Sequence, residues 1–336
     1  MVKIAILGAT GYTALELMKL LLRHPHAEIT ALTSREETAP VNIVHPSLTG
    51  RLSLRLENLP AEEIAKRADC VFSCLPHTAT AAIAPALLDR GLKVIDFGAD
   101  YRLDSADVFK KWYGVDHPDA DRLGKVPYGL PELFRSKIIG ASLVANPGCY
   151  PTSAILPLAP LLKNDFVEAD DIIIDSKSGV SGAGRKPSMK TVYPECNEAI
   201  SAYGVGTHRH TPEISQILQT AGGKEVKIIF TPHLTPMDRG ILSVSYSKIK
   251  KEGLTQEMIL DTLRNFYKDE PFVQIVDALP TTKDVIHTNR CHITSRIVGG
   301  RILMISVIDN LIKGASGAAV QNFNILFGFP ETTALL

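Results

Sequence analysis

The sequence has no surplus of charge of either sign. Among its 336 residues, 36 lysines and arginines are balanced by 36 aspartates and glutamates. Domains that bind nucleic acid, and proteins held by charge on anionic membranes, usually carry a basic surplus. We therefore expect no nucleic-acid partner and no membrane partner.

Long apolar runs and a cysteine framework are also absent. No apolar run is long enough to span a bilayer, and the opening "MVKIAILGATG" is typical of a strand leading into a glycine motif rather than of a secretory signal. The cysteine count is odd, the spacings are scattered and no CxxC occurs, which argues against disulfides and against a zinc site. We expect a cytoplasmic protein without a metal, whose reduced thiols are Cys70, Cys74, Cys149, Cys196 and Cys291.

Repeats, low-complexity segments and flexible linkers are missing as well, and the length suggests two domains. Up to about residue 145, apolar strands alternate with helical patterns, which predicts a Rossmann-like α/β domain with a parallel sheet. Later strand-like runs such as "DIIIDSKSG" and "ILSVSYSKI" have fewer helices between them, which predicts an α+β domain with a mixed or antiparallel sheet. We place the domains at 1–148 and 149–311, and we expect a helix at 314–328, capped near Ser316, within a segment 312–336 that completes the first domain.

A glycine-rich turn, "GATGYTALEL" (8–17), follows the first predicted strand and opens a helix. Gly8 permits a tight turn, Gly11 lets a phosphate approach the backbone, and Ala14 takes the third place of a GxxGxxA spacing. The first strand-to-helix turn of such a domain is where dinucleotides bind, because the helix N-terminus attracts phosphate. The alternative is a turn without a ligand.

The end of the second predicted strand discriminates NAD from NADP. An acidic residue there would bind the ribose 2′-hydroxyl, whereas an arginine would favour the 2′-phosphate of NADP. The stretch "TSREE" offers Ser34 and Arg35 first, and Glu28 lies at the wrong end of the strand. We predict NADP, with Arg35 as an ordinary surface charge as the alternative.

The stretch "NPGCYPTSA" places Cys149 between two backbone stiffeners. Pro151 suits the first position of a helix, so we expect Cys149 just ahead of a helix N-terminus, where a thiolate is stabilised over a thiol. We expect Pro157 and Pro160 to break or kink that helix. The alternative is an ordinary buried cysteine in a turn.

A proton acceptor for such a thiol is offered by "GTHRHTPEI" (206–214). Thr211 and Pro212 predict a helix start, so His208–His210 would be extended chain, with both imidazoles on one side and Arg209 on the other. A metal site is disfavoured, because no further ligand stands at a suitable spacing. A capping or solvated histidine pair is the alternative.

Two further stretches have polar side chains suited to anions. "SKSGVSGAGRK" (176–186) follows a strand and combines hydroxyls, glycines and cations, which favours an anion cradle or else a mobile loop. Arg102 lies near the carboxyl end of the strand "KVIDFG", the edge where ligands bind in open α/β sheets. A surface salt bridge is equally allowed there.

Motifs along nearly the whole chain carry a family resemblance. They are, in order, "GATGYTALEL", "CLPH", "ADYRL", "VPYGLPEL", "ANPGCYPT", "SGVSGAGRKP", "GTHRHTPEI", "HLTPMDRGI" and "DNLIKGASGAAVQN". Together they resemble the N-acetyl-γ-glutamyl-phosphate reductases, arginine-biosynthesis enzymes related to the aspartate-semialdehyde dehydrogenases. Ala14 is one departure, because the family usually has glycine there; alanine is tolerated at such a position.

The resemblance implies a mechanism and a set of site residues. Cys149 would attack the acyl phosphate, phosphate would leave, and NADPH would reduce the thioester to N-acetylglutamate 5-semialdehyde, with His210 as the acid/base. Substrate or phosphate contacts are implied for His208, Arg102, Asn146, Ser178, Gly179 and Arg185. Cofactor contacts are predicted for Gly8, Thr10, Gly11, Tyr12, Thr13, Ser34, Arg35, Pro76, Gly182, Asn310, Lys313 and Gly314.

The resemblance also implies a homo-oligomer, a dimer or homotetramer. Two alternatives stay open at the level of the sequence. One keeps the chemistry but uses aspartyl phosphate or a carrier-linked aminoadipyl phosphate. The other is a non-catalytic NADP-binding regulator, which would need the glycine turn but not Cys149 or His210.

Overall fold

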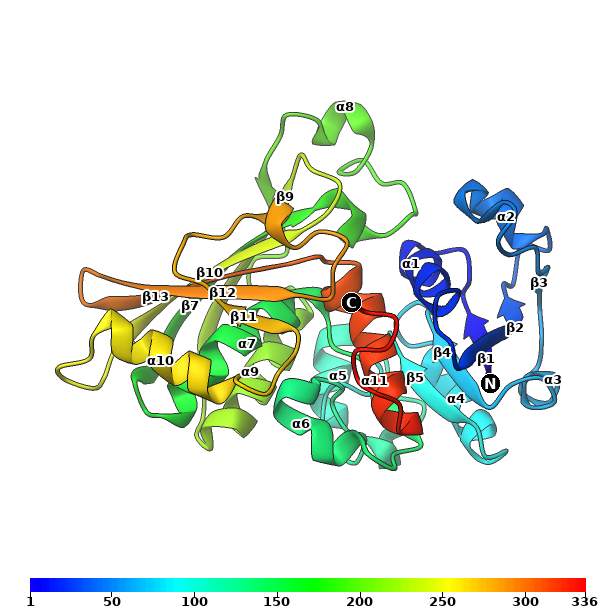
Figure 1. Ribbon diagram of the computed structural model, residues 1–336, viewed down its shortest axis with the longest axis horizontal. Helices are drawn as coiled ribbons and strands as arrows, with labels where there is room; N and C mark the ends of the chain where they lie inside the picture. The colour runs from blue at the N-terminus through cyan, green and yellow to red at the C-terminus, as the bar shows by residue number, and fades with distance from the viewer. The chain divides into compact units, whose positions relative to one another are not determined.

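The computed structural model describes residues 1–336, and the chain divides into two compact units (Figure 1). Unit 1 comprises Met1–Pro147 together with Ala315–Leu336, and unit 2 comprises Gly148–Gly314. The chain therefore leaves unit 1 just before Cys149 and returns to it after Gly314.

Unit 1 is built on a six-stranded sheet in the order β3-β2-β1-β4-β5-β6. Every adjacent pair in it is parallel, which confirms the Rossmann-like prediction. Its strands are β1 (Val2–Leu7), β2 (Ala27–Thr33), β3 (Leu56–Glu57), β4 (Cys70–Ser73), β5 (Lys93–Asp96) and β6 (Leu143–Ala145). The strand order reverses between β1 and β4, and in open parallel sheets ligands bind at the carboxyl ends of the strands at such a reversal.

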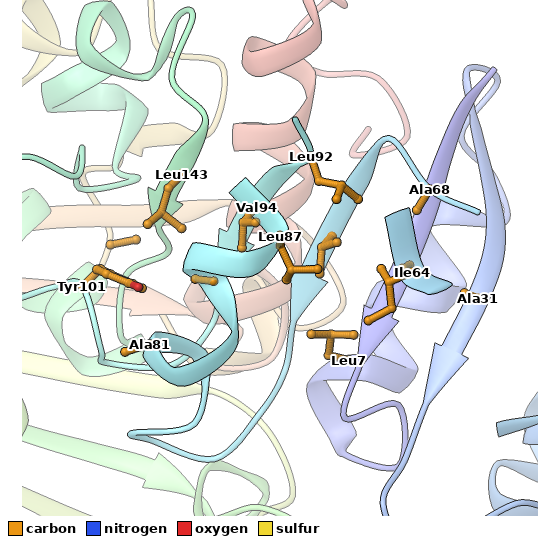
Figure 2. Packing of buried hydrophobic residues seen from close by; sticks show 14 of the residues in the cluster. Leu7, Ala31, Ile64, Ala68, Ala81, Leu87, Leu92, Val94, Tyr101 and Leu143 are labelled. Atoms are coloured by element: carbon orange, nitrogen blue, oxygen red, sulfur yellow. The ribbon is translucent and has the colours of Figure 1, made fainter. Parts of the chain in front are cut away.

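The longer helices of unit 1 fill the connections between its strands. They are α1 (Tyr12–Leu21), α3 (Ala61–Ala65), α4 (Thr80–Leu88), α5 (Ala106–Tyr113) and α6 (Pro131–Ile138), with short helical turns at α2 (Val41–Val44), Pro46–Leu48 and Ala120–Arg122. Figure 2 shows part of the core that they form: Leu87 of α4 and Ile64 of α3 pack toward Leu7 and Val94 of the sheet. This packing fixes where the strand ends stand.

The last helix, α11 (Gly317–Phe327), is buried in unit 1 although it carries amide side chains. Asn322 donates to the Gly129 carbonyl and to Asn146 Oδ1 at 2.8 and 3.1 Å. Ser316 stands at the N-cap position of α11 as predicted, but its side chain does not cap the helix, because a π-helical turn, Ile312–Ser316, runs directly into α11. Ser316 Oγ instead donates to the Thr13 carbonyl of α1.

Unit 2 contains a seven-stranded mixed sheet in the order β11-β12-β13-β10-β7-β9-β8. Its strands are β7 (Val167–Gly179), β8 (Ser201–Ala202), β9 (Ile228–Thr235), β10 (Ile241–Ile249), β11 (Val273–Ile275), β12 (Cys291–Val298) and β13 (Arg301–Ile308). Its helices are α7 (Cys149–Lys163), α8 (Tyr193–Cys196), α9 (His210–Gly222) and α10 (Gln256–Phe266), with 3-10 turns at Val180–Ala183 and Thr282–Asp284. Its neighbouring strands include both parallel and antiparallel pairs, so the sheet is mixed, as the sequence predicts.

Helix α7 corrects two expectations about prolines. It begins at Cys149, so Pro151 is its third residue, and it continues unbroken through Pro157 and Pro160. A proline removes the hydrogen bond to the carbonyl four residues earlier. Here Ser306 Oγ donates to the Ser153 carbonyl and Tyr267 Oη donates to the Leu156 carbonyl, both at 2.6 Å. Hydroxyl groups from elsewhere in unit 2 thus replace the two missing bonds.

Strand β10 has its polar and apolar faces reversed relative to an ordinary half-buried strand. Ser243, Ser245 and Ser247 are buried, whereas Leu242, Val244 and Tyr246 on the opposite face are only partly buried. Ser243 Oγ lies 2.7 Å from Ser153 Oγ of α7, so the serine face is the one covered by the helix. The apolar side chains of β10 therefore lie on the opposite face of the sheet.

No helix in the chain combines the length and the apolar character that a membrane crossing requires.

Candidate active site

The glycine turn of unit 1 has two glycines with different roles. Gly8 has φ +72°, and a Cβ there would lie 2.6 Å from the Cys74 carbonyl oxygen. The fold of the turn therefore requires glycine at this position whether or not a ligand binds. A Cβ on Gly11 would meet nothing closer than 3.9 Å. Gly11 precedes α1, which has no side-chain cap and no acidic residue in its first turn. The N–H groups at this helix start suit a phosphate, and the residues present therefore fit a dinucleotide.

The other residues of the predicted cofactor contact in unit 1 lie at ends of its parallel strands. Thr10, Tyr12 and Thr13 follow β1, and the Thr13 side chain hydrogen-bonds the Cys74 thiol. Burial raises the pKa of Cys74, which disfavours a thiolate at this residue. Pro76 follows β4 and is exposed.

Ser34 and Arg35 directly follow β2. Ser34 Oγ accepts the Glu37 N–H at 3.0 Å, which closes a tight turn, and the Arg35 side chain is exposed. Glu37 turns back on its own backbone, where its carboxylate accepts the N–H groups of Thr38 and Ala39. Arg35 is thus the first exposed charge after the strand, and Glu36 beside it is the second.

Arg102 and Asn146 are buried within unit 1, at 5% and 1% exposure. Arg102 donates to the carbonyls of Asn146 and Phe97 at 2.9 and 2.8 Å, so the surface salt bridge considered from the sequence is wrong. The Asn146 amide donates to the Ala315 carbonyl and accepts from Asn322. These bonds fix the chain three residues before Cys149.

Cys149 is the first residue of α7, with Gly148 as the N-cap. This differs from the prediction, which put Cys149 ahead of the helix. Its thiol is half-buried, and Gly314 packs against it: a Cβ on Gly314 would lie 2.8 Å from Cys149 Cβ. Any larger residue at 314 would displace the nucleophile or its helix.

His208 and His210 stand at the start of α9, which begins at His210 rather than at Thr211 or Pro212. The expected extended conformation is therefore wrong. His208 Nδ1 accepts the His210 N–H at 3.1 Å, and this bond turns the chain into the helix early. The two rings still lie together, with centroids 4.8 Å apart, and Arg209 is exposed.

The protonation state of His208 follows from its surroundings. Burial, assisted by the charge of Arg209, lowers the pKa of His208 to about 4. The rings of Tyr150, Tyr203 and Phe230 lie within 5.7 Å of the His208 ring. Because Nδ1 accepts a backbone N–H, the proton of the neutral ring is on Nε2. His208 is therefore an uncharged hydrogen-bond donor at neutral pH.

Glu213 joins the N-termini of α7 and α9. It lies one turn after His210, is 1% exposed, and its Oε1 accepts the Gly148 N–H at 2.9 Å. Tyr150 and His210 also have ring centroids 5.9 Å apart. The helix that begins with the candidate nucleophile and the helix that begins with the candidate acid/base therefore meet at their first turns.

The stretch from Ser178 to Arg185 is partly ordered by internal contacts. Gly179 packs so closely on the Asp238 backbone that a Cβ would lie 2.5 Å away. Asn310 donates to Ser181 Oγ and accepts the Gly240 N–H, which ties the loop to β10. Gly182 and Arg185 are exposed beyond this anchor. These contacts argue against the mobile-loop alternative for the anchored part, and the anion cradle stays a prediction.

Lys313 is the largest charged side chain that unit 2 buries completely. Its Nζ lies 5.4 Å from the centroid of the Phe272 ring, a cation–π distance. It sits between Asn310 and Gly314 in the segment that returns the chain to unit 1.

Two family models match the chain. Residues 3–141 match the NAD binding domain of semialdehyde dehydrogenases, and residues 149–310 match the semialdehyde dehydrogenase dimerisation domain. A Rhodopirellula baltica protein named N-acetyl-gamma-glutamyl-phosphate reductase is 53% identical over 99% of this chain and 98% of its own length. A Moorella thermoacetica protein of the same name is 49% identical over 100% and 98%.

The chain belongs to the N-acetyl-gamma-glutamyl-phosphate reductase family. Among solved structures it is similar to aspartate semialdehyde dehydrogenase II of Vibrio cholerae, with a TM-score of 0.73 and 18% identity over 98% of both chains. It is also similar to the Candida albicans aspartate semialdehyde dehydrogenase with NADP, with a TM-score of 0.69 and 17% identity over 97% and 98%. At these identities the likeness concerns the fold.

Sequence reasoning missed three residues around the candidate site of this reductase-family chain. The sequence spacing could have indicated Glu213, because it stands three residues after His210 and so shares a helix face with it. No sequence pattern indicated Tyr150 and Tyr203, since their hydroxyl contact at 3.2 Å depends on β8 pairing with β9.

Proposed function

We propose that the protein reduces N-acetyl-γ-glutamyl phosphate to N-acetylglutamate 5-semialdehyde with NADPH and releases phosphate, a step of arginine biosynthesis. The observation that carries this proposal is the full-length identity of about one half to curated reductases of that name. Cys149 at the first residue of α7 supplies the group that the reaction needs.

The Cys149 thiolate attacks the acyl carbon, the bond to the phosphate oxygen breaks, and phosphate leaves with its electron pair. The product is a thioester, a better hydride acceptor than a carboxylate. The positive end of the α7 dipole favours the thiolate, and Gly148 and Gly314 add no side-chain bulk beside the sulfur. When bound, NADPH supplies the hydride that reduces the acyl carbon.

His210 is our choice for the acid/base. It takes up the hydroxyl proton of the tetrahedral adduct as the carbon–sulfur bond breaks and the aldehyde leaves. His208 donates its Nε2–H to substrate without adding charge, and Glu213 holds the two helix starts together. Arg102, Asn146, Ser178, Gly179 and Arg185 remain our candidates for substrate or phosphate contacts.

NADP is proposed in preference to NAD because Arg35 is the first charged residue after β2 and is exposed, ahead of the exposed Glu36. In unit 1, Gly8, Thr10, Gly11, Tyr12, Thr13, Ser34 and Pro76 would hold the cofactor. Gly182, Asn310, Lys313 and Gly314 remain our further candidates for cofactor contacts. Unit 1 would then be the NADP-binding domain and unit 2 the catalytic and oligomerisation domain.

A homo-oligomer is proposed from the reversed polarity of β10. Val244 pairs with Ile305 and Tyr246 with Leu303 on neighbouring β13, so the apolar row continues across strands on the face without α7. A second copy is the simplest cover for such a face, in a dimer or a tetramer. A cytoplasmic location is proposed because Cys149 must remain a free thiol.

The proposal is tested by running the reaction backwards on a panel of semialdehydes with phosphate and NADP. We expect turnover with N-acetylglutamate semialdehyde and at most a trace with aspartate semialdehyde or a carrier-linked aminoadipate semialdehyde. Cys149→Ser should abolish phosphate-dependent turnover while NADPH binding persists. Full activity of this variant would contradict the thioester mechanism, and a preference for another semialdehyde would contradict the substrate.

A further inference from the structure

The turn between β4 and α4 contains an uncommon backbone conformation. Thr78 has φ +74°, and it is the only β-branched residue with positive φ in the chain. A β-branched side chain in the left-handed region is disfavoured, and such residues persist only where neighbouring groups hold them.

The group that holds it is the buried carboxylate of Asp100. Asp100 Oδ1 accepts the Thr78 N–H at 2.6 Å, and Oδ2 accepts the Ala81 N–H at 2.9 Å. Asp100 has no exposed surface. Helix α4 lacks a side-chain cap of its own, so Asp100, from the segment after β5, caps it while fixing the turn.

The rest of the turn is attached to the same segment. Thr80 Oγ1 donates to Asp96 Oδ1 at 2.6 Å and lies 2.9 Å from Ser73 Oγ of β4. Thr80 thus bonds to the last residue of β5, and Thr78 bonds to Asp100, which follows that strand. The turn is therefore tied at residues 78, 80 and 81.

This turn borders the glycine turn of unit 1. The Cys74 carbonyl, at its start, is the atom that a Cβ on Gly8 would meet at 2.6 Å, and the Leu75 nitrogen follows at 3.4 Å. β1 and β4 are the neighbouring strands at which the sheet order reverses. Both turns therefore stand where an open parallel sheet binds its ligand.

We propose that Asp100 is a positioning residue for cofactor binding: it holds Thr78 in the left-handed conformation and so shapes the wall of the dinucleotide site beside Gly8. The proposal rests on the proposed function, because it takes the glycine turn as the cofactor site. Asp100 does not touch the cofactor in this account. It acts through the backbone of residues 76–81.

The test uses Asp100→Asn in the full-length chain. An amide has one acceptor oxygen and one donor nitrogen, so it satisfies one of the two N–H groups and opposes the other. We expect NADPH, followed by its fluorescence, to bind about tenfold more weakly. Asp89→Asn, which removes an exposed carboxylate at the other end of α4, is the matched control and should bind as the unaltered chain does.

Rescue distinguishes positioning from general loss of stability. Glycine adopts positive φ without strain, whereas alanine does not. Asp100→Asn combined with Thr78→Gly should recover most of the NADPH affinity, and Asp100→Asn with Thr78→Ala should not. Equal recovery by both, recovery by neither, or unchanged binding by Asp100→Asn alone would each overturn the proposal.

A second measurement does not require the cofactor. Amide hydrogen exchange in residues 76–81 of the free protein should be faster in Asp100→Asn than in the unaltered chain and in Asp89→Asn. Unchanged exchange would refute the anchoring itself. Failure of the unaltered chain to bind NADPH would instead refute the cofactor proposal, and with it the role of this turn, whatever the exchange shows.

Discussion

At the scale of the residue, the candidate site depends on side chains whose state is set by their neighbours. His208 is uncharged because burial lowers its pKa to about 4, and its Nδ1 bond to the His210 N–H leaves the proton on Nε2. Thr78 is held by Asp100, and Cys149 is given room by Gly314.

The sequence indicated Cys149 and the histidines, because their types and spacing are distinctive. It did not indicate Asp100, whose partners are about twenty residues away.

The lowered pKa of His208 predicts how stability depends on pH. Between pH 6.5 and about 4, the unfolded chain binds a proton at this residue and the folded chain does not. The free energy of unfolding therefore falls as the pH falls through this range, by at most about 1.4 kcal/mol per pH unit from His208. Below pH 4 the contribution is constant.

His208→Gln should remove this contribution. Denaturant unfolding of both proteins from pH 4.5 to 7 gives their free energies of unfolding, and the variant should lose less stability toward acid pH. Parallel curves for the two proteins would show that His208 is not held neutral by the fold.

At the scale of the element, the two helices that carry the candidate catalytic groups begin where the sequence did not place their starts. Local signals pointed to Pro151 and to Thr211–Pro212, yet α7 begins at Cys149 and α9 at His210. The differences arise from bonds that local patterns do not encode, such as Glu213 to the Gly148 N–H. Likewise, the survival of α7 through two prolines depends on Ser306 and Tyr267, which lie more than a hundred residues away.

Tyr267→Phe should destabilise unit 2 by about 1–2 kcal/mol, because it leaves the buried Leu156 carbonyl without a donor. In a Pro160→Ala background the same change should cost clearly less, since an alanine at position 160 supplies the helical N–H for that carbonyl. A double-mutant cycle on the free energy of unfolding measures the difference.

Ser306→Ala provides the control for this cycle. It deprives a different carbonyl, that of Ser153, so its cost should not depend on residue 160. If Pro160→Ala leaves the cost of Tyr267→Phe unchanged, the hydroxyl does not replace the missing helical bond.

At the scale of the whole molecule, the order of strand-like and helical stretches along the chain was sufficient to predict two kinds of sheet. Alternating strands and helices predicted the parallel sheet of unit 1, and the later strand-rich half predicted the mixed sheet of unit 2. The reversed polarity of β10 was not foreseen, because alternation alone does not tell which face a helix covers. The buried serines of β10 face helix α7, and Tyr246 and Val244 lie on the opposite face of the sheet.

The apolar face of β10 predicts the effect of a charge there. Tyr246→Asp should shift the protein from its oligomer to a monomer in light scattering, because a carboxylate is costly to bury in an apolar contact. Lys268→Asp, an exposed charge change after α10, should leave the size unchanged. An oligomer that survives Tyr246→Asp would place the interface elsewhere.

The central claim is that Cys149 carries the acyl group of the substrate. Mixing the protein with N-acetyl-γ-glutamyl phosphate in the absence of NADPH, followed by acid quench and mass spectrometry, tests it most directly. We expect one N-acetylglutamyl group per chain, located on the peptide containing Cys149, with an equal amount of phosphate released. An acyl group on another residue, or phosphate release and later reduction without any acylated protein, would contradict it.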